Sequence, residues 1–442
     1  MTRDDIGAQA AEQAAFDEVA ARLRRDEELW TDFRALCRHG GRMAGTASER
    51  AAQDWCEQQL SVFGTVARES TPYAGWRCDH AVLMRLPDGR QLEAVPLLGT
   101  AFTPEEGIEL PVLDLGRGTP DMITAAGDAV RGHAVMVQHE YPFSTRTVHR
   151  RVKLAAAQQA GAAALLVVQP EAGIGPVSGS SGRGGGPGIP AMGISAEAGL
   201  ALRQPGARVR LCIGGEDLPQ ARTDTLVLDL PAGQAAHPDE RVVLSAHIDG
   251  HPLAESALDN ATGVAAAMAL ARAFAPRMHV MRRGLTVCLF SAEEWALNGS
   301  REWLAALPQA RRAAMALNVN LDSLAGSPRL TALTSGFERL GGFARSGASL
   351  AGGDLGVHLP LMSNSDHANF AAWGIPALRL IAGFDEPDSA LRLLLTPADT
   401  RALVDQGHLR GATVLAAGVL WRALRADSLG GLRNEPAPGG GA

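Results

Sequence analysis

Short apolar runs separated by polar, glycine-containing segments recur along the second half of the chain. Residues 242–244 (Val-Val-Leu) are β-branched and apolar, and polar residues flank them, which predicts a buried strand. Residues 285–290, 316–321 and 375–381 have the same character. Between the first two runs, the alanine-rich residues 264–274 favour a helix. This alternation predicts an α/β fold with a central mixed sheet.

The two ends of the chain show helical patterns. Residues 12–63 predict two helices joined by residues 39–46, and the amphipathic second helix suits the cover of a sheet. Residues 398–424 predict a final helix with one buried face. The Gly- and Pro-rich residues 428–442 have little to bury, which predicts a disordered tail.

The pattern changes before and after residue 95. Residues 81–84 and 91–95 alternate as strands do, with Asp88-Gly89 as the turn of a hairpin. From 95 to about 215, short apolar runs lie between Gly- and Pro-rich loops, and the Gly/Ser tract 173–188 predicts a mobile loop. No metal-like group of residues occurs here, so this block is predicted to bind, gate or oligomerise. Its expected strands are 112–115, 133–138 and 163–168, and its expected helix is 152–160.

Length and composition narrow the class of protein. A chain of 442 residues predicts two domains, and 46% hydrophobic with 20% charged residues is typical of a globular protein. The formal net charge is −7 without a Lys/Arg-rich block, so no nucleic-acid partner is expected. Without a signal-peptide core, a long apolar stretch or paired cysteine motifs, we expect a cytoplasmic protein with reduced thiols and no membrane partner. The oligomeric state stays open, with a homodimer as one option.

Acidic residues and histidines follow the predicted strands. His247 and Asp249 come directly after the first strand, and Asp259 lies where the alanine-rich helix begins. Glu293 and Glu294 follow the second strand. Because ligands bind outside the carboxyl ends of strands in open α/β sheets, these groups should meet at one edge. Asp322 follows the third strand, and His367 lies in Ser365-Asp366-His367 before the fourth.

The donor types indicate the metal. His247, Asp259, Glu294, Asp322 and His367 combine imidazole with carboxylate and include no thiolate, which suits Zn²⁺ in an open catalytic site. Five ligands are too many for one tetrahedral ion that keeps a water. They suit two Zn²⁺ ions about 3.5–4 Å apart that share one carboxylate. Glu293 adjoins a ligand and points elsewhere, so we predict that it is the general base.

These motifs resemble the di-zinc exopeptidases that include bacterial leucyl aminopeptidase, aminopeptidase Y and glutamate carboxypeptidase. The opening turn Arg42-Met43-Ala44-Gly45-Thr46 and the closing segment Thr396-Pro397-Ala398-Asp399-Thr400 are also similar to that family. Residues 132–137 and 153–163 resemble a protease-associated domain, which several members carry as a non-catalytic insertion. The other matching residues are His247, Asp249, Asp259–Gly263, Glu293, Glu294, Asp322 and Ser365–His367.

The resemblance implies a role for each residue. Asp259 would bridge the zinc ions, His247 and Asp322 would complete one site, and Glu294 and His367 would complete the other. Asp249 would orient His247, since a metal histidine needs an acceptor on its other nitrogen. The resemblance also implies a cis peptide between Asp259 and Asn260. The expected fold is the three-layer zinc-exopeptidase fold with an inserted, β-rich protease-associated domain.

We therefore predict a metallo-aminopeptidase that hydrolyses N-terminal peptide bonds of a peptide or small amide, through a water activated by two zinc ions and Glu293. A carboxypeptidase or other amidase, and a silent binding protein that uses the inserted domain, stay as alternatives. The predicted boundaries are 1–94 and 216–427 for the catalytic domain, 95–215 for the inserted domain and 428–442 for the tail.

Two features qualify the resemblance. Several members place a tyrosine near the last histidine to hold the tetrahedral intermediate, but the tyrosines here are Tyr73 and Tyr141, far upstream. The oxyanion must then be held by zinc or by another donor. His251 is an alternative sixth ligand, although a contact beside the filled site or a surface position is favoured.

A related di-zinc family with a lid domain is disfavoured, because only 367 − 322 = 45 residues separate Asp322 from His367.

Overall fold

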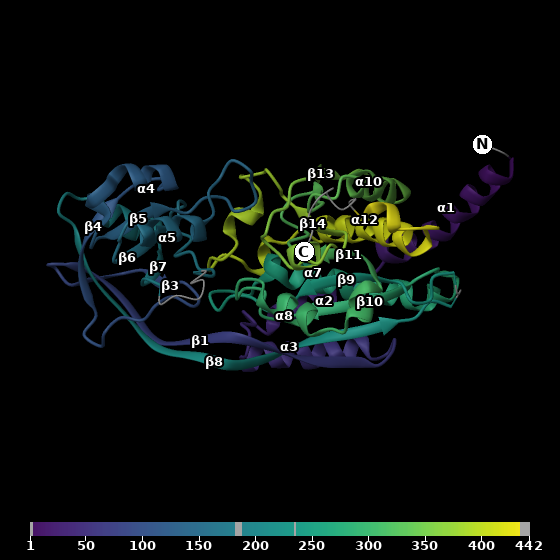
Figure 1. Cartoon of the computed structure of the whole chain (residues 1–442), viewed down its shortest axis with the longest axis horizontal. Coiled ribbons are helices and arrows are strands. Elements are labelled where there is room, and N and C mark those ends of the chain that lie inside the picture. Colours follow the sequence, from purple (N-terminus) through teal and green to yellow (C-terminus); the bar gives the residue numbers. More distant parts are fainter. Residues whose placement is uncertain (1–2, 182–187, 234–235, 434–442) are drawn as a thin grey trace.

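Two long paired strands join two lobes of unequal size in the computed structural model, which describes residues 3–181, 188–233 and 236–433 (Figure 1). The strands are β1 (Val66–Leu86) and β8 (Arg208–Leu230), and they pair antiparallel along their whole length. Figure 1 shows both strands running below the larger lobe and into the smaller one. The sheets of the two lobes are therefore continuous.

The larger lobe contains a mixed sheet with parallel inner strands. Its strand order is β13-β12-β14-β11-β9-β10-β8. Strand β9 (Arg241–His247) pairs parallel with β10 (Gly284–Phe290) and with β11 (Met315–Leu321). The central mixed sheet predicted from the sequence is confirmed. The remaining strands are β12 (Leu330–Leu333), β13 (Gly356–His358) and β14 (Ala377–Ala382).

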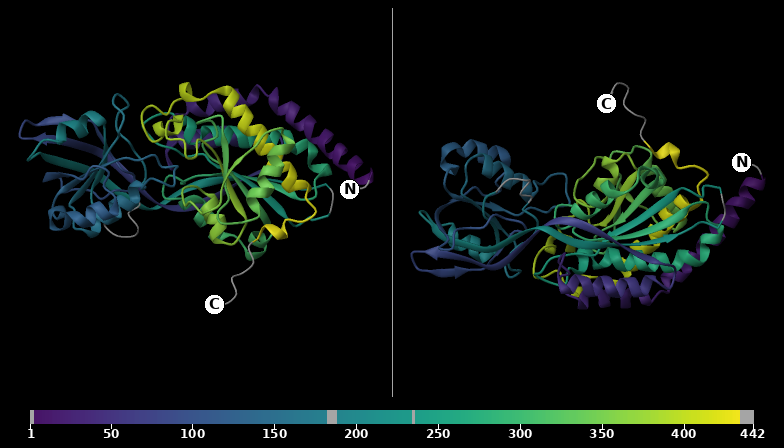
Figure 2. Two further views of the ribbon diagram at one scale, coloured as in Figure 1. Left: turned by 90° about the horizontal axis from the view of Figure 1, so that it is seen from above. Right: turned by 60° about the horizontal axis from the view of Figure 1, so that its bottom comes forward.

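Helices cover both faces of this sheet, because the inner strands are apolar on both sides. Val242 and Leu244 of β9 lie in the main core with α7 (Thr262–Phe274) and α12 (Gln406–Arg425). Val243, between them, packs in the opposite core with α8 (Asn298–Ala306) and α11 (His367–Ala372), near α9 (Gln309–Ala313). The three layers are visible in Figure 2. The main core also includes α1 (Arg3–Arg24), α2 (Glu28–Arg38), α3 (Ala47–Leu60) and α10 (Leu340–Leu350).

The smaller lobe contains the other part of this continuous sheet and has a core of its own. Its strands follow the order β4-β5-β6-β7-β3, with parallel pairs from β4 to β7. Trp76 and Leu83 of β1 pack into this core. The hairpin at Asp88-Gly89 is confirmed, since Arg85 pairs with Arg90 of β2 (Arg90–Leu92). The other elements are β3 (Ala94–Pro96), β4 (Ile108–Asp114), β5 (Ala134–Gln138), β6 (Ala164–Val168), β7 (Ala191–Ile194), α4 (Pro120–Ala126), α5 (Arg150–Gln159) and α6 (Ala196–Leu202).

Two helix predictions are wrong at their boundaries. The stretch before residue 39 forms two helices, because the Asp26 carboxylate accepts hydrogen bonds from the backbone N–H groups of Glu28 (2.9 Å) and Leu29 (3.2 Å) and so starts α2. The final helix begins at Gln406 rather than at residue 398. Here Asp405 caps the helix by accepting from the N–H of His408 at 2.8 Å. No described helix combines the length and the apolar character that crossing a membrane requires.

The predicted loop 173–188 is partly packed. Val177 is buried, and the backbone N–H of Ser178 donates to the carbonyl of Leu395 at 2.7 Å, which ties the smaller lobe to the larger one. Residues 182–187 of this loop, and residues 434–442 of the predicted tail, lie outside the described residues. The tail residues Gly430–Leu432 form a single 3-10 turn.

Helices α10 and α12 approach each other closely at two glycines. A Cβ added to Gly418 would lie 2.2 Å from the carbonyl oxygen of Gly347, whereas a Cβ added to Gly411, on the same helix, would meet nothing within 4 Å. We predict that Gly418→Ala lowers the free energy of unfolding by about 1–3 kcal/mol, because it overpacks the contact. Gly411→Ala should be neutral or stabilise by up to about 1 kcal/mol, since alanine favours a helix. Urea unfolding of both variants measures this, and equal effects would contradict the close approach.

Candidate metal centre

The predicted site residues meet at the carboxyl ends of the parallel strands. His247 is the last residue of β9 and pairs with Phe290, the last residue of β10. Glu293 follows β10 by three residues, and Asp322 directly follows β11. Parallel pairing therefore brings residues that are far apart in sequence to one edge of the sheet.

Imidazole and carboxylate groups lie close enough at this edge to share a metal ion. The Nε2 atom of His247 is 3.2 Å from Oδ1 of Asp259 and 3.7 Å from Oδ1 of Asp322. Two groups have ligand atoms that all lie within 4.8 Å of one another. One contains His247, Glu293 and Asp322, and the other contains His247, Asp259 and Glu294. All of these side chains except the partly exposed Asp259 are buried.

Two further histidines lie near the cluster. His367 begins α11 and is fully buried, but it belongs to neither close group. Among the described residues, neither of its ring nitrogens has a hydrogen-bond partner. His251, which the sequence favours only as a neighbour of the site, has its Nε2 atom 2.7 Å from Oε1 of Glu294. His251 is thus in direct contact with a predicted ligand, whereas the ring of His367 interacts electrostatically with Asp322.

Asp249 connects two parts of the site. Its carboxylate lies 3.6 Å from Nδ1 of His247, and its backbone carbonyl lies 3.1 Å from the same nitrogen. The same carboxylate accepts hydrogen bonds from the backbone N–H groups of Glu293 (3.1 Å) and Glu294 (3.2 Å). The contact with the two glutamates was not predicted from the sequence. Asp249 therefore positions both sides of the cluster.

The loop that carries Asp259 is held by motifs from opposite ends of the chain. Arg42 is buried and donates to the backbone carbonyls of Ile248 (2.9 Å) and Ser256 (2.8 Å). Asp399 accepts from the backbone N–H groups of Leu258 (2.8 Å) and Asp259 (3.3 Å). The Asp259-Asn260 peptide is cis, as the resemblance implies. Both the opening and the closing segment therefore support this carboxylate.

The carboxylates of the cluster repel one another. Burial raises the pKa of Glu293 well above its ordinary value, and the carboxylate of Glu294 adds to this increase. The pKa of Glu294 is raised in the same way, first by burial and then by Asp259. Burial would also raise the pKa of Asp322, but Arg379, 3.1 Å from its carboxylate, and His247 outweigh this effect and lower it. A bound cation would offset the remaining repulsion.

Buried nitrogen and oxygen atoms that make no hydrogen bond are consistent with metal binding. Among the described residues, the ring nitrogens of His367 are buried without a hydrogen-bond partner. Nε2 of His247 and Oε1 of Glu294 are buried in short contacts with Asp259 and His251, but these contacts do not have hydrogen-bond geometry. Buried polar atoms rarely lack partners, so these atoms point to a missing ligand. Together with a donor set free of thiolates, they fit a catalytic zinc centre.

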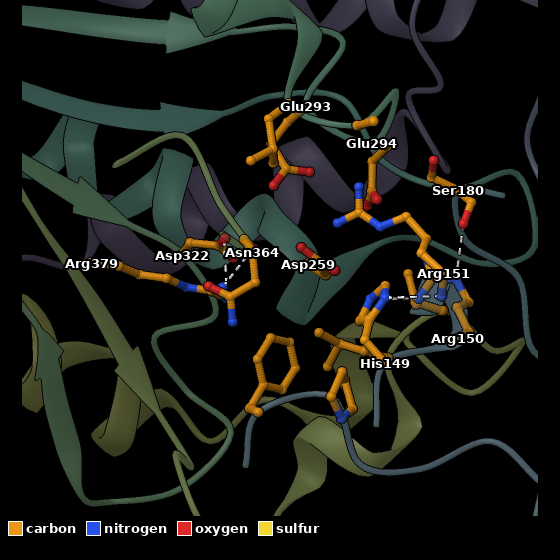
Figure 3. Close-up of a pocket in the computed structure, with 16 residues that line it drawn as sticks. His149, Arg150, Arg151, Ser180, Asp259, Glu293, Glu294, Asp322, Asn364 and Arg379 are labelled. Atoms are coloured by element: carbon orange, nitrogen blue, oxygen red, sulfur yellow. Dashed lines mark hydrogen bonds and ion pairs between the residues drawn. The ribbon is translucent and has the colours of Figure 1, made fainter. Parts of the chain in front are cut away.

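A pocket over the cluster receives residues from both lobes (Figure 3). Sequence analysis missed this contribution, because the inserted block has no metal-like pattern. Figure 3 shows Arg150 and Arg151, at the start of α5, on one side of Asp259, with Asn364 and Arg379 on the other. The smaller lobe contributes Pro142, Phe143, His149, Arg150, Arg151 and Ser180 to the lining.

Arg150 is a buried cation in this wall. Its Nε atom donates to the carbonyl of Ser180 at 3.2 Å, and a Cβ on Gly179 would clash with its guanidinium. Within the described residues, no carboxylate forms an ion pair with Arg150 or Arg151. Burial, with a contribution from Arg151, lowers the pKa of Arg150 to about 10, although Glu294 and Asp259 oppose this shift. Arg150 therefore carries a positive charge at neutral pH.

The fold and the cluster define an α/β protein with a candidate metal centre at the edge of its sheet. Residues 225–417 match the model of peptidase family M28, and residues 104–202 match that of the PA domain. Residues 225–417 therefore resemble peptidase family M28, and residues 104–202 resemble a PA domain. The first match contains every predicted metal ligand, and the second contains Arg150 and Arg151. The predicted α/β fold, inserted domain and peptidase class are confirmed, whereas the domain boundaries and the residue roles stay predictions.

Solved structures share this architecture along nearly the whole chain. BSAP, a zinc aminopeptidase from Bacillus subtilis, is 21% identical, with 94% of this chain and 95% of that chain covered at a TM-score of 0.69. An aminopeptidase from Aneurinibacillus sp. strain AM-1 is also 21% identical, with coverages of 93% and 96% at a TM-score of 0.69. A peptidase M28 precursor from Shewanella amazonensis SB2B is 19% identical, with coverages of 95% and 97% at a TM-score of 0.77. No curated protein matches the sequence.

Proposed function

We propose that this chain is a zinc-dependent aminopeptidase that binds two Zn²⁺ ions and releases N-terminal residues from peptides. The observation that carries the proposal is the buried cluster of carboxylates and imidazoles at the carboxyl ends of the parallel strands. The match of residues 225–417 to the model of peptidase family M28 supports the hydrolysis of peptide bonds. The similar fold of BSAP, described as a zinc aminopeptidase, supports the choice of metal and of substrate end.

In this proposal Asp259 would help to hold both ions. His247 and Asp322 complete one site, and the short distances from Nε2 of His247 to both carboxylates support this grouping. Glu294 and His367 would complete the other site, and the buried ring nitrogens of His367, which have no partner among the described residues, support this assignment. His251 is an alternative ligand beside Glu294, because the two side chains are already in contact.

The proposed reaction has a separate role for the two ions, for Glu293 and for Asp249. When bound, the two ions supply Lewis-acid polarisation of the substrate carbonyl and lower the pKa of water to near neutrality. Glu293 accepts a proton from the attacking water and delivers it to the leaving amine nitrogen. Asp249 keeps Glu293 in place through its backbone N–H. The buried position of Glu293 raises its affinity for a proton, as a proton shuttle requires.

A carboxypeptidase is the second candidate, and one observation favours it. Arg150 and Arg151 line the pocket without a carboxylate partner among the described residues, and an arginine pair suits a substrate carboxylate. In an aminopeptidase the free amine of the substrate is recognised, whereas in a carboxypeptidase the free carboxylate is recognised. The substrate end that must be uncapped therefore separates the two candidates.

Turnover of end-capped substrates tests the proposal. We expect the zinc-loaded protein to hydrolyse a dipeptide amide with a free amine and to leave its N-acetyl counterpart intact, because the amine is recognised. A chelator should abolish turnover, and added Zn²⁺ should restore it. Hydrolysis of N-acetyl dipeptides that requires a free carboxylate would instead support the carboxypeptidase. Absence of turnover on every substrate, with zinc bound, would contradict both candidates.

The role of Glu293 can be isolated by an isosteric change. We expect Glu293→Gln to lower kcat by about 10²- to 10⁴-fold, because glutamine cannot carry the proton. Its zinc content, measured by atomic emission, should stay at the wild-type level. Glu338→Gln, which changes an exposed acid of the same lobe, is the matched control and should keep wild-type turnover. Near-normal turnover of Glu293→Gln would show that another group moves the proton.

A further inference from the structure

The pocket lacks the tyrosine that would hold negative charge on the substrate. Tyr73 donates its hydroxyl hydrogen to the carbonyl of Ala44 at 3.0 Å, and Tyr141 donates to the carbonyl of Gly383 at 2.6 Å. Neither tyrosine lines the pocket over the cluster. Attack on a peptide carbonyl places negative charge on its oxygen, and a preorganised donor at that oxygen speeds the reaction. Zinc or another group of the pocket would then hold this charge.

Asn364 is a polar side chain that the pocket leaves unused. It lines the same pocket as Asp259, Glu293 and Asp322. Both its Nδ2 and its Oδ1 atoms are buried, and among the described residues neither has a hydrogen-bond partner. An orphaned amide of this kind is rare in a folded protein, since each buried polar atom normally finds a partner. A peptide group, with one carbonyl and one N–H, would satisfy both atoms.

The backbone that carries Asn364 is fixed relative to the cluster. Arg379 is buried, and its Nη1 atom donates to the carbonyl oxygen of Asn364 at 2.9 Å. Its Nη2 atom lies 3.1 Å from Oδ2 of Asp322, so one guanidinium connects Asn364 to a predicted metal ligand. The guanidinium also lies over the ring of Phe143 from the smaller lobe, 5.0 Å from its centroid. The backbone at Asn364 is thus held in place before any substrate arrives.

The arginines of the pocket are less suited to this role than Asn364. The terminal nitrogens of Arg379 are occupied by Asp322 and Asn364. Arg150 is tied to Ser180 and lies, with Arg151, on the opposite side of Asp259 from Asn364 in Figure 3. The side-chain N–H of Asn364 lies in the lining of the same pocket as the cluster and, among the described residues, has no hydrogen-bond partner.

We propose that Asn364 donates a hydrogen bond from Nδ2 to the carbonyl oxygen of the scissile peptide bond, where negative charge develops. This role rests on the proposed peptidase function. The charge on that oxygen grows as the bond is attacked, so the hydrogen bond is stronger in the transition state than in the bound substrate. Loss of the donor should therefore lower kcat more than it raises KM. The Oδ1 atom would accept a hydrogen bond from a substrate N–H.

Two substitutions test the donor. Asn364→Ala removes the amide, and Asn364→Asp keeps its shape and acceptor but has no N–H to donate at neutral pH. For both zinc-loaded variants we expect kcat to fall by about 10²- to 10³-fold, with KM within about threefold of wild type. Ser363→Ala, at an exposed neighbouring residue, is the matched control and should keep wild-type kinetics. Zinc content should be the same in all four proteins.

A binding measurement separates this role from a structural one. A phosphinic dipeptide analogue presents a tetrahedral anion, and calorimetry should show its affinity for both variants falling by the same factor as kcat/KM. Wild-type kcat in either variant, a loss confined to KM, unchanged analogue affinity or loss of zinc would each overturn the assignment. If wild type itself hydrolyses no peptide, the proposed function fails, and that result is distinct from a failure of the Asn364 assignment.

Discussion

Repulsion between buried carboxylates is the constraint on which the rest of this structure depends. Asp259, Glu293, Glu294 and Asp322 face one another around His247 at one edge of the sheet, where burial removes the water that would screen them. The pKa values of both glutamates rise as a result. Such a cluster would be costly if it were only structural. Divalent cations remove the cost, and hydrolytic chemistry gives a reason for the cluster to exist.

Much of the surrounding structure holds these charges in place. The carboxylate of Asp249 accepts from the backbone of Glu293 and Glu294, while Asp399 accepts from the backbone of Asp259. Arg379 partly neutralises Asp322 and also fixes the loop of Asn364. Charge compensation and positioning are therefore performed by the same contacts. The smaller lobe contributes residues to the wall of the pocket, so the candidate site is shared by both lobes.

Local patterns in the sequence predicted the elements that carry the ligands. Residues 242–244 are apolar and β-branched, and β9 forms there because both of its faces are buried. The spacing of His247, Glu293 and Asp322 relative to their strands predicted that they would meet, and they do. The helix boundaries at Asp26 and Asp405 were missed, because a single capping side chain outweighed a continuous helical pattern.

Contacts between lobes could not be read from the sequence. Arg150 belongs to a segment without metal-like residues, and only the fold brings it over the cluster. Asn364 lies next to a recognised motif, Ser365-Asp366-His367, but nothing in its local sequence shows that its amide lacks a partner. Only the folded pocket shows that the amide of Asn364 has no partner among the described residues. The sequence signal available was its position three residues before His367.

Anomalous diffraction at the zinc absorption edge, from crystals of the zinc-loaded protein, tests the central claim most directly. A di-zinc centre predicts two peaks about 3.5–4 Å apart, with the carboxylate of Asp259 between them. One peak should contact His247 and Asp322, and the other should contact Glu294 and His367. A single peak, or peaks away from this cluster, would contradict the di-zinc centre.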